Sequence, residues 1–276
     1  MYSKHLVNVK YIKENLKIKG LCFKKCHSNA LYELDQDHFL GLEATKKCVE
    51  DLVFKFKPED TVLDIGSGFG GVGRYIAEKT GAHVTGIEMQ KDRCDFAVRA
   101  TKNLGLNHKV SFVNDDFVTT DLRNGSFSKV IAFLSILHII DKKATINKVS
   151  NVLKTDGMIY FEDFYKMKTT FSKEENLKLR NIISCPNLLT RDEYFNELKM
   201  NNIEIQSVDD LTENWKHCAA SRFDEYNENF ELLRTQVGKV KSFKALEFAK
   251  GVLDLFDSGI IYGFRIIGKK TGYAVG

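Results

Sequence analysis

The sequence predicts an α/β fold in which a mostly parallel, doubly wound sheet carries helices on both faces. Short apolar runs alternate with segments of helical periodicity from Thr61 to Phe161. The first apolar run ends in a glycine cluster at residues 66–73, where the next helix begins. Two prolines and 43% hydrophobic residues in a chain of 276 suit an ordinary soluble domain. We therefore expect right-handed βαβ units.

The expected core elements follow one another in order along the chain. A helix with apolar Leu42, Val49, Leu52 and Val53 precedes the first strand, and Pro58 separates the two. Asp156-Gly157 marks a turn before the fifth strand. The remaining predicted elements are strand 61–65, helix 72–79, strand 84–87, helix 91–104, strand 110–113, strand 127–133, helix 142–153 and strand 158–161.

The pattern changes on both sides of this core. Residues 1–40 are rich in lysine and lack a clean period, so we expect helical pieces that form a lid over the pocket. After residue 165 the predicted elements are helices 173–183 and 191–200, strand 203–208, a long helical region 213–256 and a last strand 259–267. We expect a single domain over 1–276, divided into a lid (1–40), a cofactor-binding core (41–165) and a cap with C-terminal strands (166–276).

A glycine-rich loop follows the first strand. Gly66 and Gly68 permit positive φ angles and let a ligand lie against the main chain, beneath the N–H groups of the next helix. Gly71 completes a G-x-G-x-x-G spacing, which is also used by NAD enzymes. Asp64 precedes the loop inside an apolar strand, where a carboxylate must accept hydrogen bonds. The loop therefore predicts a nucleotide cofactor.

The order Asp64-x-Gly66-x-Gly68 resembles motif I of class I methyltransferases that use S-adenosylmethionine (SAM). In that family the acid orders the loop around the methionine part of the cofactor. Glu88 ends the next strand, about twenty residues further on, where an acid accepts hydrogen bonds from ribose hydroxyls. NAD enzymes share this second acid, so it supports an adenosine ligand without choosing between cofactors.

A third acidic position follows the third strand, at Asp115 and Asp116. The methyltransferase family places an acid here to hold the adenine amino group beside an apolar residue, and Asp116 with Phe117 matches that pattern. The alternative is a solvated turn with a helix cap. Three acids at three successive strand ends favour the cofactor site.

A wider resemblance extends over about residues 32–164. Gly41–Lys47, followed by Val62–Gly68, resembles the phosphoethanolamine N-methyltransferases and the enzymes that methylate glycine, sarcosine and dimethylglycine. This resemblance implies a Rossmann-like seven-stranded sheet with an antiparallel last strand, and a helical cap inserted between the last two strands. It also implies SAM as cofactor, S-adenosylhomocysteine as product, and cofactor contacts from Asp64, Gly66, Ser67, Gly68, Glu88, Met89, Asp115, Asp116, Phe117, Leu134 and His38.

The acceptor residues follow the family pattern only in part. The family carries an aspartate, a short apolar stretch and a histidine after strand four; here these positions hold Leu134 and His138. His138 is the candidate general base, because a protonated amine must lose a proton before it attacks. The alternative is a histidine packed behind the pocket. Asp163 is either an amine anchor that replaces the lost aspartate or a helix cap.

The lid and the cap each carry a candidate aromatic residue. Lys24 and Lys25 fall near the family's lid tyrosine, and Tyr32 is the tyrosine candidate for the catalytic set. Trp215 lies in the cap, where we expect it to pack the cap onto the sheet; a cation–π contact to a methylated ammonium is the alternative.

Composition limits the partners. The net charge of +4 comes from 41 basic and 37 acidic residues without a dense basic block, so we expect no nucleic acid. No apolar run approaches a membrane span or a signal sequence, and we expect a cytoplasmic monomer or homodimer acting on a small molecule. Cys22 and Cys26 lack a second ligand pair, so no metal is expected.

These observations predict a SAM-dependent methyltransferase that acts on a small amine of the phosphoethanolamine or glycine type. Three alternatives stay open: an O-methyltransferase of the same fold, a non-catalytic SAM-binding module, and an NAD-dependent reductase. Leu134 favours the O-methyltransferase alternative, because leucine cannot attract a cationic amine.

Overall fold

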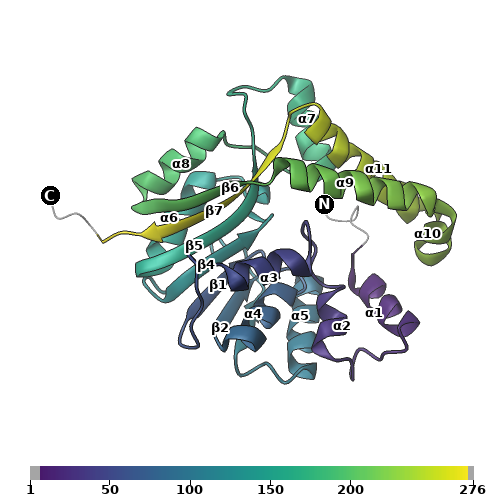
Figure 1. The fold of residues 1–276 in the computed structure, drawn as a ribbon, viewed down its shortest axis with the longest axis horizontal. Helices are drawn as coiled ribbons and strands as arrows, with labels where there is room; N and C mark the ends of the chain where they lie inside the picture. The colour runs from purple at the N-terminus through teal and green to yellow at the C-terminus, as the bar shows by residue number, and fades with distance from the viewer. Residues whose placement is uncertain (1–6, 273–276) are drawn as a thin grey trace.

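The computed structural model describes residues 7–272 and contains a seven-stranded sheet of order β3-β2-β1-β4-β5-β7-β6 (Figure 1). Strands β1 to β5 pair in parallel, and β7 runs antiparallel to both β5 and β6. The strands are β1 (Thr61–Ile65), β2 (His83–Ile87), β3 (Val110–Val113), β4 (Phe127–Phe133), β5 (Leu153–Tyr165), β6 (Ile203–Asp210) and β7 (Tyr262–Lys270). The predicted fold class is confirmed. The strand order reverses between β1 and β4, which is where ligands bind in such sheets.

Helices cover both faces of this sheet (Figure 1). The helices are α1 (Val9–Ile18), α2 (Ser28–Tyr32), α3 (Leu42–Glu50), α4 (Gly71–Thr80), α5 (Lys91–Asn103), α6 (Lys142–Val152), α7 (Lys173–Ile183), α8 (Arg191–Met200), α9 (Thr212–Glu228), α10 (Phe230–Val237) and α11 (Lys239–Asp257), with a short 3-10 helix η1 (Ile136–His138) after β4. α3 and α4 pack on one face, and α6 and α8 on the other.

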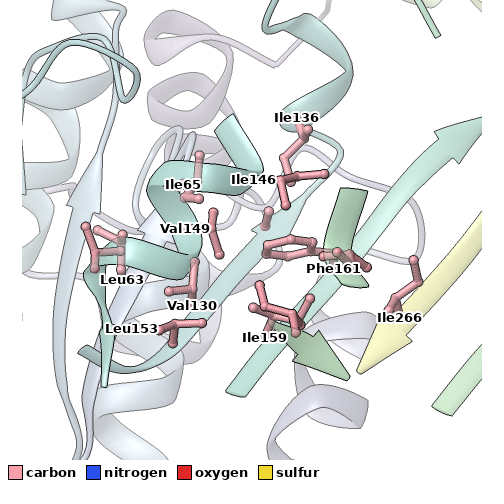
Figure 2. Close-up of a cluster of buried hydrophobic side chains, with 14 of the residues drawn as sticks. Leu63, Ile65, Val130, Ile136, Ile146, Val149, Leu153, Ile159, Phe161 and Ile266 are labelled. Atoms are coloured by element: carbon pink, nitrogen blue, oxygen red, sulfur yellow. The ribbon is translucent and has the colours of Figure 1, made fainter. Parts of the chain in front are cut away.

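The larger hydrophobic core lies between the sheet and α6 (Figure 2). Ile65, Val130 and Phe161 from three neighbouring strands contact Ile146 and Val149 of α6, and all five are at most 1% exposed. Side chains on a strand alternate between its faces, so the residue before Ile65 must point the other way. This alternation directs the acid of the first strand toward α4 and the glycine loop.

The predicted lid contains two helical pieces that pack against the core. Ile12 and Leu16 of α1 and Leu31 of α2 join a buried cluster with Phe69 and Phe96. Residues 1–6 of the predicted lid and 273–276 of the predicted C-terminal segment lie outside the described residues. The division into lid, core and cap stays a prediction of the sequence.

A helical segment is inserted between β6 and β7, as expected, but it is divided into the three helices α9, α10 and α11. We use "cap" for these helices together with α7, which lies between β5 and β6. α11 begins after Gly238, whose φ of +85° suits glycine and ends the preceding helix. Trp215 of α9 is fully buried and stacks on Phe39 of the lid with a centroid distance of 5.1 Å. Its indole therefore joins the cap to the lid and the sheet, which is the packing role expected of it.

Within residues 7–272, no group of three or more His, Cys, Asp and Glu side chains is placed to hold a metal ion. No helix in that range is long and apolar enough to cross a membrane. All six cysteines of the chain lie in the range and carry free thiols.

Candidate active site

A cavity of about 970 Å³ lies at the carboxyl ends of β1, β2 and β4. Its walls come from the glycine loop, the lid segment 35–39, the turn that carries η1, and the cap helices α7, α9 and α11. Every residue predicted to contact the cofactor lines this cavity, and so does His138; Tyr32 and Asp163 do not.

The backbone of the glycine loop is shaped for a close ligand. Gly66 and Gly68 have φ of +69° and +55°. A Cβ atom on Gly66 would lie 2.5 Å from the Cβ of Ser135, so no larger residue fits there. The N–H groups of Gly66 and Ser67 donate to the Ile87 carbonyl at 2.9 and 3.0 Å, which ties the loop to the end of β2.

Glu88 is held in one orientation at the end of β2. Its Oε2 accepts the Gly68 N–H at 2.8 Å and its Oε1 accepts the Gln90 N–H at 2.7 Å. Asn114 donates from Nδ2 to the carbonyls of Glu88 and Met89 at 2.8 and 3.0 Å, which fixes the end of β3 beside β2. Each carboxylate oxygen retains a lone pair, so Glu88 can also accept from ribose hydroxyls. Asn114 was not predicted as a site residue.

The carboxyl group of Asp64 is buried beneath the loop, and its pKa is raised. Asp64 is 2% exposed, and burial raises the pKa of its carboxyl to about 7, with the nearby charge of Glu88 adding to the rise. Its Oδ2 has no hydrogen-bond partner among the described residues. A cationic or hydrogen-donating group of a ligand would satisfy that oxygen.

Buried polar atoms that lack a partner among residues 7–272 gather around the cavity. They include Asp35 Oδ1, Gln36 Nε2, His38 Nε2, Asp64 Oδ2 and Ser67 Oγ. Such atoms are normally paired in folded proteins, so their concentration here indicates a polar ligand. The set offers both acceptors and donors, which fits the amino-acid end of SAM, with its ammonium and carboxylate groups.

The lid segment is fastened to the glycine loop by a buried ion pair. Arg74 of α4 donates to Asp35, and the same Nη2 donates to the Phe69 carbonyl at 2.8 Å. Both side chains of the pair are fully buried. A Cβ on Gly71 would lie 2.2 Å from Asp35 Oδ1, so the lid rests directly on the loop. Asp35 and Gln36 were not predicted as site residues, although the polar run at residues 35–38 is a signal in the sequence.

The acids after β3 form a turn at the edge of the cavity. Asp116 accepts the Val118 N–H at 2.8 Å, and Asp115 accepts the Asp116 N–H at 2.8 Å. Both acids are exposed, whereas Phe117 is buried in the core. The two carboxylates therefore hold the turn, as the alternative interpretation expected, and also face the cavity.

His138 lines the cavity from η1, the short helix after β4. Leu134 has φ of +48° and its N–H donates to the Glu162 carbonyl at 2.8 Å, which turns the chain into η1. The Nδ1 of His138 is 3.3 Å from the Ser184 carbonyl. This contact assigns the proton to Nδ1 and makes Nε2 the basic nitrogen.

The η1 turn is supported from below by a buried cation. Lys142 donates from Nζ to the Leu137 carbonyl at 3.0 Å and also to the Ile139 carbonyl. Burial lowers the pKa of its ammonium. Lys142 is 3% exposed and was not predicted; it holds the carbonyls on both sides of His138.

Two predicted catalytic residues, Tyr32 and Asp163, do not line the cavity. Tyr32 is fully buried, donates to Glu78 at 2.9 Å and packs edge-on against Tyr75, so the predicted lid tyrosine faces α4. Asp163 accepts the Phe164 N–H at 2.8 Å and is 1% exposed. Strand alternation puts Phe164 at the cavity and Asp163 on the opposite face of β5, toward α6.

The fold and this site define a class I methyltransferase, whose methyl donor is SAM. Residues 56–237 match the family described as "Methyltransferase domain". The chain belongs to this family, and SAM is its cofactor.

The relatives agree with this assignment. Phosphoethanolamine N-methyltransferase of Plasmodium falciparum is 31% identical over 197 residues, which are 69% of this chain and 70% of that protein. Phosphoethanolamine N-methyltransferase 1 of Arabidopsis thaliana is 36% identical over 134 residues, 49% of this chain but 26% of that protein, so the match spans about a quarter of its length. The structure of phosphoethanolamine N-methyltransferase 2 from Haemonchus contortus, with phosphomonomethylethanolamine and S-adenosylhomocysteine, has a TM-score of 0.73 at 15% identity and covers 94% of this chain and 60% of that one. The last comparison shows a shared fold.

Proposed function

We propose that the chain methylates an amine nitrogen of a small acceptor, with His138 as the general base. One observation carries the proposal: a single cavity brings the predicted cofactor residues and His138 together. SAM supplies an activated methyl group, so the protein must position the acceptor, exclude water and remove a proton. The Nε2 of His138 is suited to that last step, because imidazole titrates near neutral pH.

In this proposal each cofactor residue contacts a different part of SAM. Glu88 accepts from the ribose hydroxyls, Asp116 receives the adenine amino group, and Asp64 faces the amino-acid end. Gln36 adds an unpartnered, buried Nε2 at that end, where a carboxylate would accept its hydrogen bond. His38, stacked on Phe133 at 4.8 Å, closes the wall between the lid and β4.

An oxygen acceptor is the second candidate. Leu134 lines the cavity where the family carries an aspartate, and Asp163 faces away from it, so neither position offers a carboxylate to an ammonium. A hydroxyl or carboxylate acceptor needs no such partner.

Methyl transfer from labelled SAM to a panel of acceptors tests the proposal. The panel contains phosphoethanolamine with its mono- and dimethyl forms, glycine, sarcosine, dimethylglycine, and hydroxyl and carboxylate compounds of similar size. SAM binding is measured on the same preparation. Label in an amine supports the proposal; label only in the oxygen compounds moves the assignment to the second candidate. SAM binding without any transfer would rule out the amine assignment.

Glu88→Gln is expected to weaken SAM binding by about tenfold to a hundredfold. The amide nitrogen would face the Gly68 or Gln90 N–H where an oxygen now accepts, so one of these hydrogen bonds is lost. Isothermal titration calorimetry on the variant measures the effect. Glu204→Gln, at an exposed position on β6, is the matched control and should bind SAM as the unmodified chain does. An unchanged Kd in Glu88→Gln would remove this residue from the site.

Asp64→Asn is expected to make the cofactor-free protein more stable at pH 8 while weakening SAM binding. Burial raises the pKa of Asp64 from 3.8 to about 7, so the folded state binds more protons than the unfolded state between these values. Stability is therefore lost as pH rises toward 7. Urea unfolding measures the free energy of unfolding at pH 5 and at pH 8. Between these two pH values it should fall by about 1–3 kcal/mol less in the variant than in the unmodified chain. Parallel pH profiles for the two proteins would contradict this expectation.

A further inference from the structure

The cap side of the cavity has a different chemistry from the cofactor side. The acids Asp64, Glu88, Asp115 and Asp116 all lie at the strand ends. The lining that comes from residues 164–252 contains no acid at all among the described residues. The apolar lining on this side consists of Phe164, Ile183, Pro186, Ala219, Phe248, Ala249 and Val252. Phosphoethanolamine and glycine have almost no apolar surface to place against such a wall.

Two arginines interrupt this apolar wall. Arg180 lies on α7 and Arg222 on α9, and both line the cavity. The guanidinium of Arg222 lies over the Phe39 ring at 5.7 Å from its centroid, which places it at the junction of cap and lid. Neither arginine has a carboxylate within ion-pair distance among residues 7–272.

Two acids that line the cavity beside the cap helices have other partners. Asp37 pairs with Arg93 at 3.2 Å, and Asp141 caps α6 through the Ala144 N–H at 2.9 Å. In the lining that comes from residues 164–252 both charged side chains are therefore cations, which favours an anion over a bare ammonium beside them.

We propose that the acceptor is an amphipathic anion, in which a phosphate or carboxylate group binds Arg180 and Arg222 and an apolar body packs on the cap helices. This inference rests on the proposed function for the site but names an acceptor larger and more apolar than phosphoethanolamine or glycine. Arginine suits the anionic group because its planar guanidinium can donate two parallel hydrogen bonds to it. The apolar wall adds affinity in proportion to the surface that it buries.

The proposal is tested by binding, with ligands that cannot be methylated at nitrogen. The full chain is loaded with S-adenosylhomocysteine and titrated with hexyl phosphate, heptanoate, inorganic phosphate and 1-hexanol. At least one alkyl anion should bind about tenfold or more tightly than inorganic phosphate and 1-hexanol. Whichever alkyl anion binds more tightly identifies the anionic group.

Three variants assign the binding to the cap. The double variant Arg180→Gln/Arg222→Gln should bind the preferred alkyl anion about tenfold or more weakly and should bind 1-hexanol with unchanged affinity. Phe248→Ala should lower the affinity for the alkyl compounds and leave the affinity for inorganic phosphate unchanged. Arg234→Gln, at an α10 arginine that pairs with Glu231 outside the cavity, is the control. Retained affinity for S-adenosylhomocysteine shows that each variant is folded.

The possible outcomes separate this inference from the proposed function. Inorganic phosphate binding as tightly as both alkyl anions, undiminished anion binding in the double variant, or no binding of any ligand would overturn the inference. Methylation of phosphoethanolamine together with any of these results would leave the proposed function standing. Tight, arginine-dependent binding of an alkyl anion without methylation of any amine would support the inference and overturn the amine assignment.

Discussion

Replacing His138 by alanine is expected to lower kcat for amine methylation by about 10²- to 10⁴-fold, with the Kd for SAM essentially unchanged. The imidazole lines the cavity, and the Ser184 carbonyl at 3.3 Å orients it. Without this base, the small fraction of acceptor that is already deprotonated must carry the reaction. The kcat of the variant should therefore rise with pH and approach that of the unmodified enzyme above the pKa of the amine.

The control for this experiment is His108→Ala. His108 is exposed, and its Nδ1 contacts the Gly105 carbonyl at 3.0 Å in the turn after α5. The control should keep full activity. An unchanged kcat in His138→Ala, or a loss that is equally large at every pH, would show that His138 is not the base.

Replacing Arg74 by methionine is expected to lower the free energy of unfolding by about 3–5 kcal/mol and to weaken SAM binding strongly. The substitution would leave Asp35 buried without its cation and would remove the bond to the Phe69 carbonyl. The lid segment would then lose its attachment to the glycine loop. Urea unfolding of the cofactor-free protein and titration with SAM measure the two effects.

The pH dependence and a second variant identify the cause of this loss. Burial raises the pKa of Asp35 to about 6 even though Arg74 opposes the rise, so without Arg74 the carboxyl should be neutral over more of the pH range. The destabilisation should therefore be smaller at pH 5 than at pH 8. Adding Asp35→Asn should recover part of the stability at pH 8. Equal losses at both pH values, with no recovery in the double variant, would show that the ion pair does not fasten the lid.

The fold and the cofactor half of the site were predictable because their signals are local. Glycines at 66 and 68, an acid two residues before them and another at residue 88 are set by backbone geometry within one βα unit and its neighbour. Parallel strands bring their carboxyl ends to one edge, so the acids meet there whatever the loops do. The structure places all of them around one cavity.

The acceptor half depends on contacts between distant segments, which local patterns do not contain. Asp163 was assigned to the cavity by its position near the end of a strand, but the face it occupies is set by the register of β5. Tyr32 was placed by its position in the lid, whereas the docking of α2 on α4 turns it toward Glu78. Asp35 was missed because its partner, Arg74, lies 39 residues away.

The cap shows the same limit. Arg180 and Arg222 come from two helices separated by β6, and nothing in either helix alone indicates that both side chains reach the cavity. Lysines 239, 241 and 244 carry a denser charge pattern in the sequence, yet they do not line it.

A crystal structure of the complex with S-adenosylhomocysteine tests the central claim most directly. We predict that the ribose hydroxyls lie within hydrogen-bond distance of Glu88, that the amino-acid end meets Asp64 and Gln36, and that the sulfur faces the part of the cavity lined by His138. Binding of the adenosine away from Glu88, or a sulfur directed away from His138, would contradict the account of this cavity as the active site.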